Sequence, residues 1–441
     1  MKKFRIKAII IALCILFSND NFAQQFNSDP VKFLADVESF LSKGGDRKTA
    51  KDFIADFTPV WNSVSSDKQQ TIITTSNSLV AKGAKAFPEY FDYINGMYGF
   101  FKNKHPETAF TQYHEVLDKI FSGIDKKKYD IFLKSTSGLF NTGVVFENVN
   151  FKWRLTSRDY KFIYDKTPVI EFLKTDLCVV SIKNDSSFIG GTSGLLKPFM
   201  DTWAGKGGIV NWERTGLDKN TTYAELNKYR LNMKTAGFDA DSCLMHTQYF
   251  EKPLEGRVSD KLVNVSKTIG HTYPKFQSYS KRLYIKDVFK NIDYEGGFAY
   301  EGASLFGTGS VSEQARLIFY KDGKKFLKGS SMNFIIKPDK ITSEKTRIVI
   351  YIDKDSINHP GLDFKFDVKE NTVYMNRGTQ GTAQAPWLNT YHMLDMKFET
   401  LSWKLETQDL NIGPTINKNQ VSEASLESNN YFSLIRYHQM E

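Results

Sequence analysis

A histidine, a glutamate and an aspartate lie at helical spacing in one segment and come nearest to a metal-binding pattern. His114 and Glu115 begin like the zinc-protease motif, in which a second histidine stands four residues after the first. Asp118 occupies that position here, and the sequence suggests no third ligand. We therefore expect an ordinary helix with a solvated polar face, and no metal site.

Three other segments begin like ion or phosphate sites and then depart from the pattern. Asp353 and Asp355 are spaced as in a calcium loop, but Ile357 stands where a third oxygen ligand belongs. The glycine-rich segment at residues 205–208 precedes a strand, whereas a phosphate loop needs a helix N-terminus. Gly307-Thr308-Gly309 lacks the spacing and the lysine of such a loop. Turns between strands explain these glycines, so we predict no cofactor.

No nucleophile motif is present. The chain has no Gly-x-Ser-x-Gly segment, and its histidines are scattered at His105, His114, His246, His271, His359, His392 and His438. A glycosidase needs only two carboxylates that the fold brings together, so a carbohydrate-active enzyme on a β-scaffold stays as the alternative hypothesis. We predict no catalytic residues.

The first 23 residues have the pattern of a secretory signal peptide. Lys2, Lys3, Arg5 and Lys7 precede an apolar run of about ten residues, and Ala23 ends a plausible cleavage site. The run is too short to span a bilayer, and no later stretch is apolar enough. The sequence therefore predicts export to the periplasm or the cell surface, with no transmembrane span in the mature chain.

The charge of the chain is mildly basic. Removal of the signal peptide takes away four positive charges and one negative charge and lowers the formal net charge from +9 to +6. No run of basic residues with interleaved aromatics indicates a nucleic-acid partner. Lys126-Lys127-Lys128 is expected to be a solvated helix start.

Two cysteines, Cys178 and Cys243, remain in the mature chain. Export permits a disulfide between them, but each lies in a strand-like run where a buried free thiol is equally expected. Both alternatives are open at this point.

Residues 28–140 have a helical pattern. Ser28 and Asp29 precede Pro30 at a helix start, and apolar residues then recur at intervals of three and four through five or six segments. Short turns with Gly or Pro separate the segments. The sequence predicts a helical bundle or a short stack of helical pairs.

Residues 144–377 have a β pattern. Leu362, Phe364, Phe366 and Val368 alternate with charged residues, which is typical of a half-buried strand. Asp322-Gly323 between apolar runs indicates a hairpin. We therefore predict an α+β multidomain protein, with a β-solenoid or roll after the helices; tandem β-sandwiches are the alternative. Within this region, residues 195–203 suggest a short helix.

Residues 378–441 are predicted to be a linker followed by the start of a further segment. Gly378 to Pro386 has low hydrophobicity, Trp387 to Trp403 is strand-like, and residues 425–435 suggest a helix. The abrupt end at Glu441 suggests the front part of a longer protein.

The chain resembles large uncharacterised exported proteins of the Bacteroidota. The resemblance rests on the end of the predicted signal peptide at residues 22–24, the predicted helical region that follows, and the predicted strands around Trp203 to Trp212. The glycine-punctuated strands of residues 144–377 also resemble, faintly, the β-solenoid modules of lipopolysaccharide-transport proteins. Asp355-Ser356-Ile357 matches the short O-glycosylation pattern of the Bacteroidota, with an ordinary turn as the alternative.

The leading functional hypothesis is a non-enzymatic envelope protein, structural or binding, whose β-surface contacts a lipid, a glycan or a protein. Trp203, Trp212, Tyr294 and Tyr300 would be the stacking residues if they were exposed; otherwise they belong to the core. A third hypothesis makes residues 28–140 a docking subunit of a secretion or outer-membrane assembly. The sequence specifies neither the partner nor the oligomeric state.

Overall fold

The computed structural model of the protein describes residues 25–123, 126–183, 185–263, 272–378, 381–413 and 424–429. The predicted signal peptide, His271 and His438 lie outside these residues. The chain divides into two compact units, residues 1–178 with 193–203 (unit 1) and residues 179–192 with 204–441 (unit 2). Among the described residues, no helix is both long enough and apolar enough to cross a membrane.

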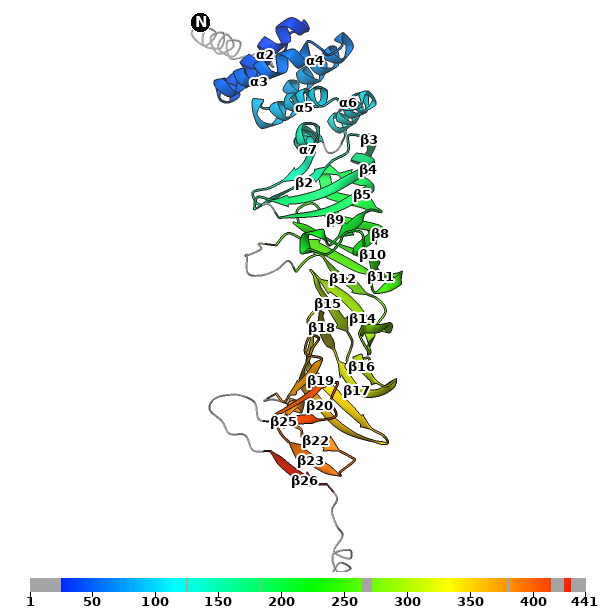
Figure 1. Ribbon diagram of the computed structural model, residues 1–441. Helices are drawn as coiled ribbons and strands as arrows, with labels where there is room; N and C mark the ends of the chain where they lie inside the picture. Colours follow the sequence, from blue (N-terminus) through cyan, green and yellow to red (C-terminus); the bar gives the residue numbers. More distant parts are fainter. Residues whose placement is uncertain are drawn as a thin grey trace, which may run out of the picture. The chain divides into compact units, whose positions relative to one another are not determined.

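Unit 1 begins with the predicted helical region (Figure 1). Its helices and helical turns are α2 (Pro30–Gly44), α3 (Arg47–Trp61), α4 (Ser66–Ala81), η1 (Ala86–Tyr90), α5 (Phe91–Lys102), α6 (Glu107–Ser122), η2 (Lys126–Lys128) and α7 (Tyr129–Thr142). Asp29 accepts a hydrogen bond from the backbone N–H of Val31 and caps α2, as the sequence indicates. Pro59 lies in the last turn of α3, which continues to Trp61.

The first strands belong to the same compact unit as the helices. These are β1 (Val144–Glu147), β2 (Phe151–Leu155), β3 (Tyr160–Asp165) and most of β4 (Thr167–Ser181). The Phe162 ring of β3 lies 5.5 Å from Tyr113 of α6 and 6.0 Å from Phe140 of α7. The predicted division near residue 140 therefore marks the change from helix to strand, while the compact unit extends beyond it.

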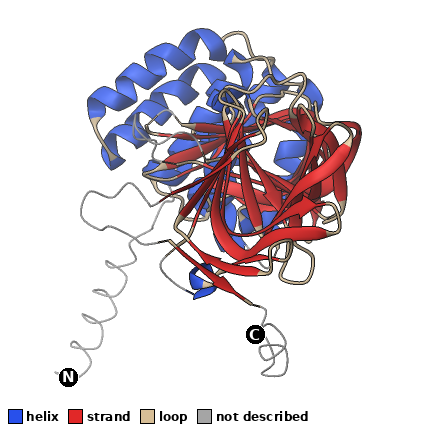
Figure 2. Ribbon diagram, turned by 60° about the horizontal axis from the view of Figure 1, so that its bottom comes forward, coloured by secondary structure: helices blue, strands red, loops and turns tan. Residues whose placement is uncertain are grey.

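Unit 2 is a large antiparallel β-sheet body (Figure 2, strands in red). The next strands along the chain are β5 (Ser186–Lys197), β6 (Thr202–Lys206), β7 (Ile209–Asn211), β8 (Tyr223–Leu226), β9 (Lys228–Asn232), β10 (Gly237–Thr247), β11 (Phe250–Lys261), β12 (Lys275–Ser278), β13 (Leu283–Phe289), β14 (Ile292–Glu301), β15 (Ser304–Thr308) and β16 (Ala315–Lys321). They are followed by β17 (Lys324–Ser331), β18 (Asn333–Lys337), β19 (Lys340–Ile352), β20 (Asp355–Asp367), β21 (Thr372–Asn376), β22 (Trp387–Asn389), β23 (Leu394–Lys397), β24 (Thr400–Lys404), β25 (Leu410–Gly413) and β26 (Ser425–Ser428).

Four sequence-based expectations are wrong in detail. Residues 195–203, expected to include a short helix, form the end of β5, a single 3-10 turn at Pro198–Met200 and the start of β6. Residues 425–428, expected to begin a helix, form strand β26. The strands after residue 387 pair with β20 and β21, so they extend the sheet of unit 2 and do not start a separate segment. Ser356 of the O-glycosylation pattern lies within β20 and not in a turn.

From β11 onward the strands form two hydrogen-bonded ladders. The first ladder runs β11–β12–β14–β15–β18–β19–β20–β21–β24–β25, and the second runs β13–β14–β16–β17–β19–β20–β22–β23–β26. Strands β14, β19 and β20 are long enough to take part in both. Each therefore has to bend between its two sets of partners.

The bends lie at residues whose backbone permits them. In β14, Gly296 pairs with β13 and Gly297 pairs with β15. A side chain at Gly296 would overlap the Tyr294 hydroxyl, because its Cβ atom would lie 2.3 Å away. In β19 the register shifts around Lys345, which has a positive φ of 51°. In β20 the change from one set of partner strands to the other falls at Pro360-Gly361, and proline has no N–H group to donate to a ladder.

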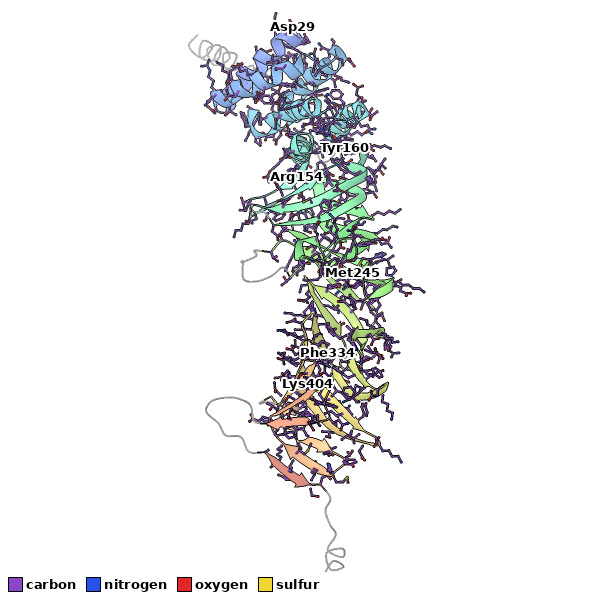
Figure 3. The ribbon with its side chains drawn as sticks, viewed as in Figure 1. Asp29, Arg154, Tyr160, Met245, Phe334 and Lys404 are labelled. Carbon is purple, nitrogen blue, oxygen red and sulfur yellow. The ribbon has the colours of Figure 1, made fainter. Side chains whose placement is uncertain are left out.

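The core lies between the inner faces of the two ladders. A row of cross-strand partners in the first ladder is buried on every strand from β11 to β24, and it comprises Val258, Phe276, Tyr300, Leu305, Ile336, Ile341, Phe366, Val373 and Trp403. From the second ladder, the Phe319 ring lies 5.6 Å from Phe366, and Phe326 lies 4.9 Å from Trp403. Phe334, labelled in Figure 3, is fully buried in the adjacent inward row.

We predict that Phe319→Ala lowers the free energy of unfolding of unit 2 by about 3–5 kcal/mol, because it leaves a cavity where the two ladders meet. Urea denaturation followed by fluorescence measures the change. Lys324→Ala, at an exposed position in the adjoining hairpin, is the control and should change stability by less than about 0.5 kcal/mol. Equal effects of the two substitutions would contradict the assignment of this core.

Candidate functional site

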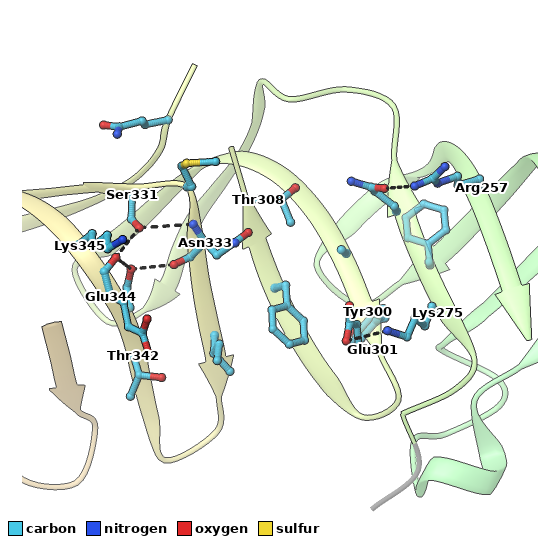
Figure 4. A pocket seen from close by; sticks show the side chains of 18 of the residues that line it. Arg257, Lys275, Tyr300, Glu301, Thr308, Ser331, Asn333, Thr342, Glu344 and Lys345 are labelled. Carbon is cyan, nitrogen blue, oxygen red and sulfur yellow. Dashed lines mark hydrogen bonds and ion pairs between the residues drawn. The ribbon is translucent and has the colours of Figure 1, made fainter. Parts of the chain in front are cut away.

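The outward-facing side of the first ladder carries a large groove. Its volume is about 1460 Å³, and its lining comes from β10, β11, β12, β14, β15, β18, β19 and β20, with Ser331 at the end of β17 and a few residues from adjoining turns. These eight strands are consecutive neighbours in the sheet. With about 4.8 Å between neighbouring strands, the groove extends over roughly 34 Å. Figure 4 shows its lining side chains.

The groove exists because of the strand alternation. The residues that line it follow or precede buried core residues by one position: Arg257 stands before Val258, and Phe306 stands after Leu305. Cross-strand pairing then places outward residues in a row, so that Gln277, Ala299 and Phe306 occupy successive strands. The register that builds the core therefore also fixes the spacing of the groove.

The centre of the groove is apolar. Phe306 and Ile335 are directly paired across β15 and β18, and Ala299 is the partner of Phe306 on the other side. Phe306 and Ile335 are partly exposed. Together they form a platform on which a flat, partly apolar group can rest.

The rest of the groove is polar. Nine lining residues are Ser, Thr, Asn or Gln, and eight are charged. Lys275 forms an ion pair with Glu301 at 3.0 Å, and the Arg257 guanidinium donates a hydrogen bond to the Gln277 side chain at 2.9 Å (Figure 4). Such a lining offers many groups that both donate and accept hydrogen bonds.

The four aromatic residues considered from the sequence are core residues. Trp203 and Trp212 are fully buried, Tyr294 is 1% exposed, and Tyr300 borders the groove but is only 4% exposed. The Tyr294 hydroxyl donates to the carbonyl of Gly297 at 2.5 Å, at the bend of β14. The aromatic residue that the groove does expose is Phe306. Sequence reasoning missed it, although its alternation with Leu305 and Gly307 is compatible with an outward position.

A buried ion cluster lies in unit 2 apart from the groove lining. The Arg214 guanidinium forms ion pairs with Asp260 and, at 3.4 Å, with Asp185. It also donates to the carbonyls of Ser186 and Lys261, at 2.8 Å and 3.1 Å. Burial raises the pKa of Asp260 to about 6, against the opposing effect of Arg214. All of the hydrogen-bonding capacity of this arginine is used to hold segments distant in the sequence together.

The other carboxyl group with a pKa raised to about 6 is Asp92 on α5 of unit 1, where burial is again the main cause. Neither Asp92 nor Asp260 lines the groove. The general acid of a glycosidase needs a raised pKa and a place in the substrate cleft. Asp92 and Asp260 have the raised pKa but lie outside the groove.

The histidine of the zinc-like pattern is occupied by two protein partners. His114 donates from Nδ1 to the carbonyl of Phe110 at 2.8 Å and accepts at Nε2 from the Tyr93 hydroxyl at 3.1 Å. The expected solvated face is wrong for this residue, because His114 is buried among the rings of unit 1. The described residues contain no group of three side chains that could hold a metal ion.

Two more buried histidines are held in the same way. His105 contacts the carbonyl of Phe140 at 2.9 Å and the Tyr160 hydroxyl at 2.7 Å. His359 contacts the carbonyl of Ala385 at 2.9 Å and accepts from the N–H of Gly361 at 3.1 Å, beside the bend of β20. When one ring nitrogen donates a hydrogen bond to a carbonyl and the other accepts one from a donor, the neutral form of histidine is favoured. These histidines support the fold.

Cys178 and Cys243 are not in a disulfide, so the disulfide alternative is wrong for this structure. The Cys243 thiol donates to the carbonyl of Gly256 at 3.3 Å, and burial raises its pKa to about 12. A thiol with a raised pKa is a poor nucleophile. It behaves as a small core residue between β10 and β11.

No protein-family model matches the chain, and neither a curated protein nor a solved structure is found to be similar to it.

We predict that Arg214→Ala lowers the free energy of unfolding by about 3–5 kcal/mol, because it leaves two carboxylates without their buried partner. Arg214→Lys should restore only part of the loss, since an ammonium group cannot reproduce the planar set of donors. Thermal denaturation measures both variants. A loss below about 1 kcal/mol for Arg214→Ala would contradict the role of the cluster as a structural clamp.

His114 makes the stability of unit 1 sensitive to acid. Burial lowers its pKa from the ordinary value of 6.5 to about 4. The unfolded chain therefore takes up a proton near pH 6.5 that the folded chain does not bind until about pH 4, and stability is lost as the pH falls through this window. We expect His114→Gln to reduce the difference in unfolding free energy between pH 7 and pH 5 by roughly 2 kcal/mol. Chemical denaturation at both pH values tests this, and identical pH dependences would contradict it.

Proposed function

We propose that the protein is a non-enzymatic binding protein that holds an extended glycan in the groove of unit 2. The observation that carries the proposal is the combination of the Phe306 platform with a long polar lining. Sugar rings have an apolar face that stacks on aromatic rings and a rim of hydroxyl groups that donate and accept hydrogen bonds. Groove residues such as Gln277, Asn333 and Thr308 provide matching groups on neighbouring strands.

The lining disfavours the two other partner classes expected from the sequence. An acyl chain needs a continuous apolar channel, and the apolar centre here is confined to a few side chains around Phe306 and Ile335. Protein interfaces are depleted in Asp, Glu, Lys and Ser at their centres, whereas these residue types make up much of the groove. The glycan is thus the class of ligand whose chemistry corresponds best to the lining.

We further propose that the protein acts in the cell envelope after export. This part rests on the basic and apolar pattern of residues 2–23 and on the resemblance to exported proteins of the Bacteroidota.

We also propose that unit 2 is a solenoid or roll. Continuous inward rows across many strands favour this fold over tandem sandwiches, because separate sandwiches would interrupt the rows.

We expect Phe306→Ala to weaken glycan binding at least tenfold while leaving the fold intact, since the side chain is on the outer face of the sheet. Affinity electrophoresis in gels containing hydroxyethyl cellulose, laminarin, gellan or polygalacturonate measures binding. Tyr391→Ala is the matched control, because Tyr391 is an exposed aromatic of unit 2 outside the groove lining.

The proposal predicts that at least one of these polysaccharides retards the wild-type protein and the Tyr391 variant equally. It is contradicted if none of them retards the wild type, or if the Phe306 variant binds as the wild type does. Purification of a tightly bound peptide in place of a glycan would likewise favour a protein partner for the groove.

A further inference from the structure

Two cations at the groove form no ion pair in the described part of the chain. Arg257 lines the groove on β11, and Lys281 lies outside the lining but reaches its residue Thr308. Among the described residues, Arg257 has the Gln277 side chain as its hydrogen-bond partner, and Lys281 donates only to the Thr308 hydroxyl at 3.4 Å. Neither side chain forms a salt bridge with a described carboxylate. Arg257 reaches towards β12 and not towards Asp241, its cross-strand partner on β10.

Cations on positions near these two are paired, whereas Lys345, another lining cation without a described ion pair, lies on β19 next to Glu344. Lys275 is held by Glu301, Arg282 by Glu313 and Arg316 by Glu295. Between β11 and β18, Glu301 is the acidic residue of the groove lining, and Lys275 neutralises it. The uncompensated charge of this part of the groove is therefore positive.

The two cations are close enough to influence each other. The pKa of Lys281 is lowered, first by partial burial and second by the positive charge of Arg257. The Lys281 stem also crosses Gly297, where a Cβ atom would lie 2.8 Å from its Cδ atom. The ammonium group is thus directed along the sheet towards Thr308 on β15, the strand that carries Phe306.

The acidic residues of the groove lie on either side of this part. Asp239 and Asp241 are on β10, and Glu344 and Asp363 are on β19 and β20. These four have no ion-pair partner among the described residues. A uniformly anionic polymer that filled the groove would be repelled at both ends, whereas neutral sugars would accept or donate hydrogen bonds there.

Resting on the proposed function, we infer that the groove binds a glycan in which one anionic sugar is flanked by neutral sugars. The anionic substituent, a carboxylate or a sulfate, lies between Arg257 and Lys281, and the sugar ring that bears it stacks on Phe306. Asp239 and Asp241 at one end, and Glu344 and Asp363 at the other, contact neutral sugars. The guanidinium provides two parallel donors to the anion, and the ammonium provides a point charge.

The test measures binding to four polysaccharides by affinity electrophoresis. Gellan carries carboxylates separated by neutral sugars, κ-carrageenan carries sulfates separated by neutral sugars, polygalacturonate is uniformly charged, and hydroxyethyl cellulose is neutral. The double variant Arg257→Gln/Lys281→Gln is compared with the wild type and with Phe306→Ala. Arg316→Gln, which removes a paired cation outside the groove lining, is the control.

We expect the wild type to bind gellan or κ-carrageenan more tightly than polygalacturonate, and the tighter of the two identifies the anion. The double variant should lose about 100-fold in affinity for that polysaccharide, about tenfold for each charge-assisted contact. Its affinity for hydroxyethyl cellulose should fall much less, by under about tenfold, because a neutral polymer forms no charge-assisted contact with these side chains. The Phe306 variant should weaken binding to charged and neutral polymers alike.

The outcomes separate the two proposals. If the double variant binds gellan and κ-carrageenan as the wild type does, while the Phe306 variant does not, the anion subsite is wrong and the glycan groove stands. Tighter wild-type binding to polygalacturonate than to both spaced polymers also overturns the inference. If the wild type binds none of the four polysaccharides, both the proposed glycan binding and the anion subsite are contradicted.

Discussion

The structure of unit 2 depends on the cross-strand alignment of apolar side chains in rows that run through many strands. Each strand of the first ladder from β11 to β24 contributes one buried member to a row, such as Phe276, Tyr300 and Leu305. The second ladder covers the rows with side chains such as Phe319. Because side chains alternate along a strand, a shift of register by one residue would turn a whole set of core residues to the outside. The burial of these rows therefore specifies the register of the sheet.

That register also determines the candidate site. The groove residues are the alternate positions of the same strands, so no separate loop or insertion is needed to position them. The bends of β14, β19 and β20 allow both ladders to share strands, and Arg214 and His359 hold the adjoining segments of unit 2. The supports of the groove are thus buried, fully bonded groups, while its lining carries the charges and the exposed ring.

The local pattern of the sequence predicted much of the fold and little of the site. The alternation from Leu362 to Val368 and the Asp322-Gly323 turn are local signals, and both gave strands and a hairpin where expected. The groove joins strands from β10 to β20 through long-range pairing, which a single sequence does not reveal. Large aromatics such as Trp212 were candidate ligand-binding residues, but they are buried, as their size favours. Phe306 gave no signal beyond its place in the alternation.

A surface assembled from one outward position per strand has a regular pitch, set by the distance between hydrogen-bonded strands. The pitch cannot be adjusted by side-chain substitution, because backbone hydrogen bonds determine it. If the repeat of a bound polymer differs from this pitch, its groups no longer align with the groove residues, and contacts are lost with increasing distance from Phe306. Repeat length would therefore be selected together with composition, and variation at outward positions could change the composition that is recognised without disturbing the core.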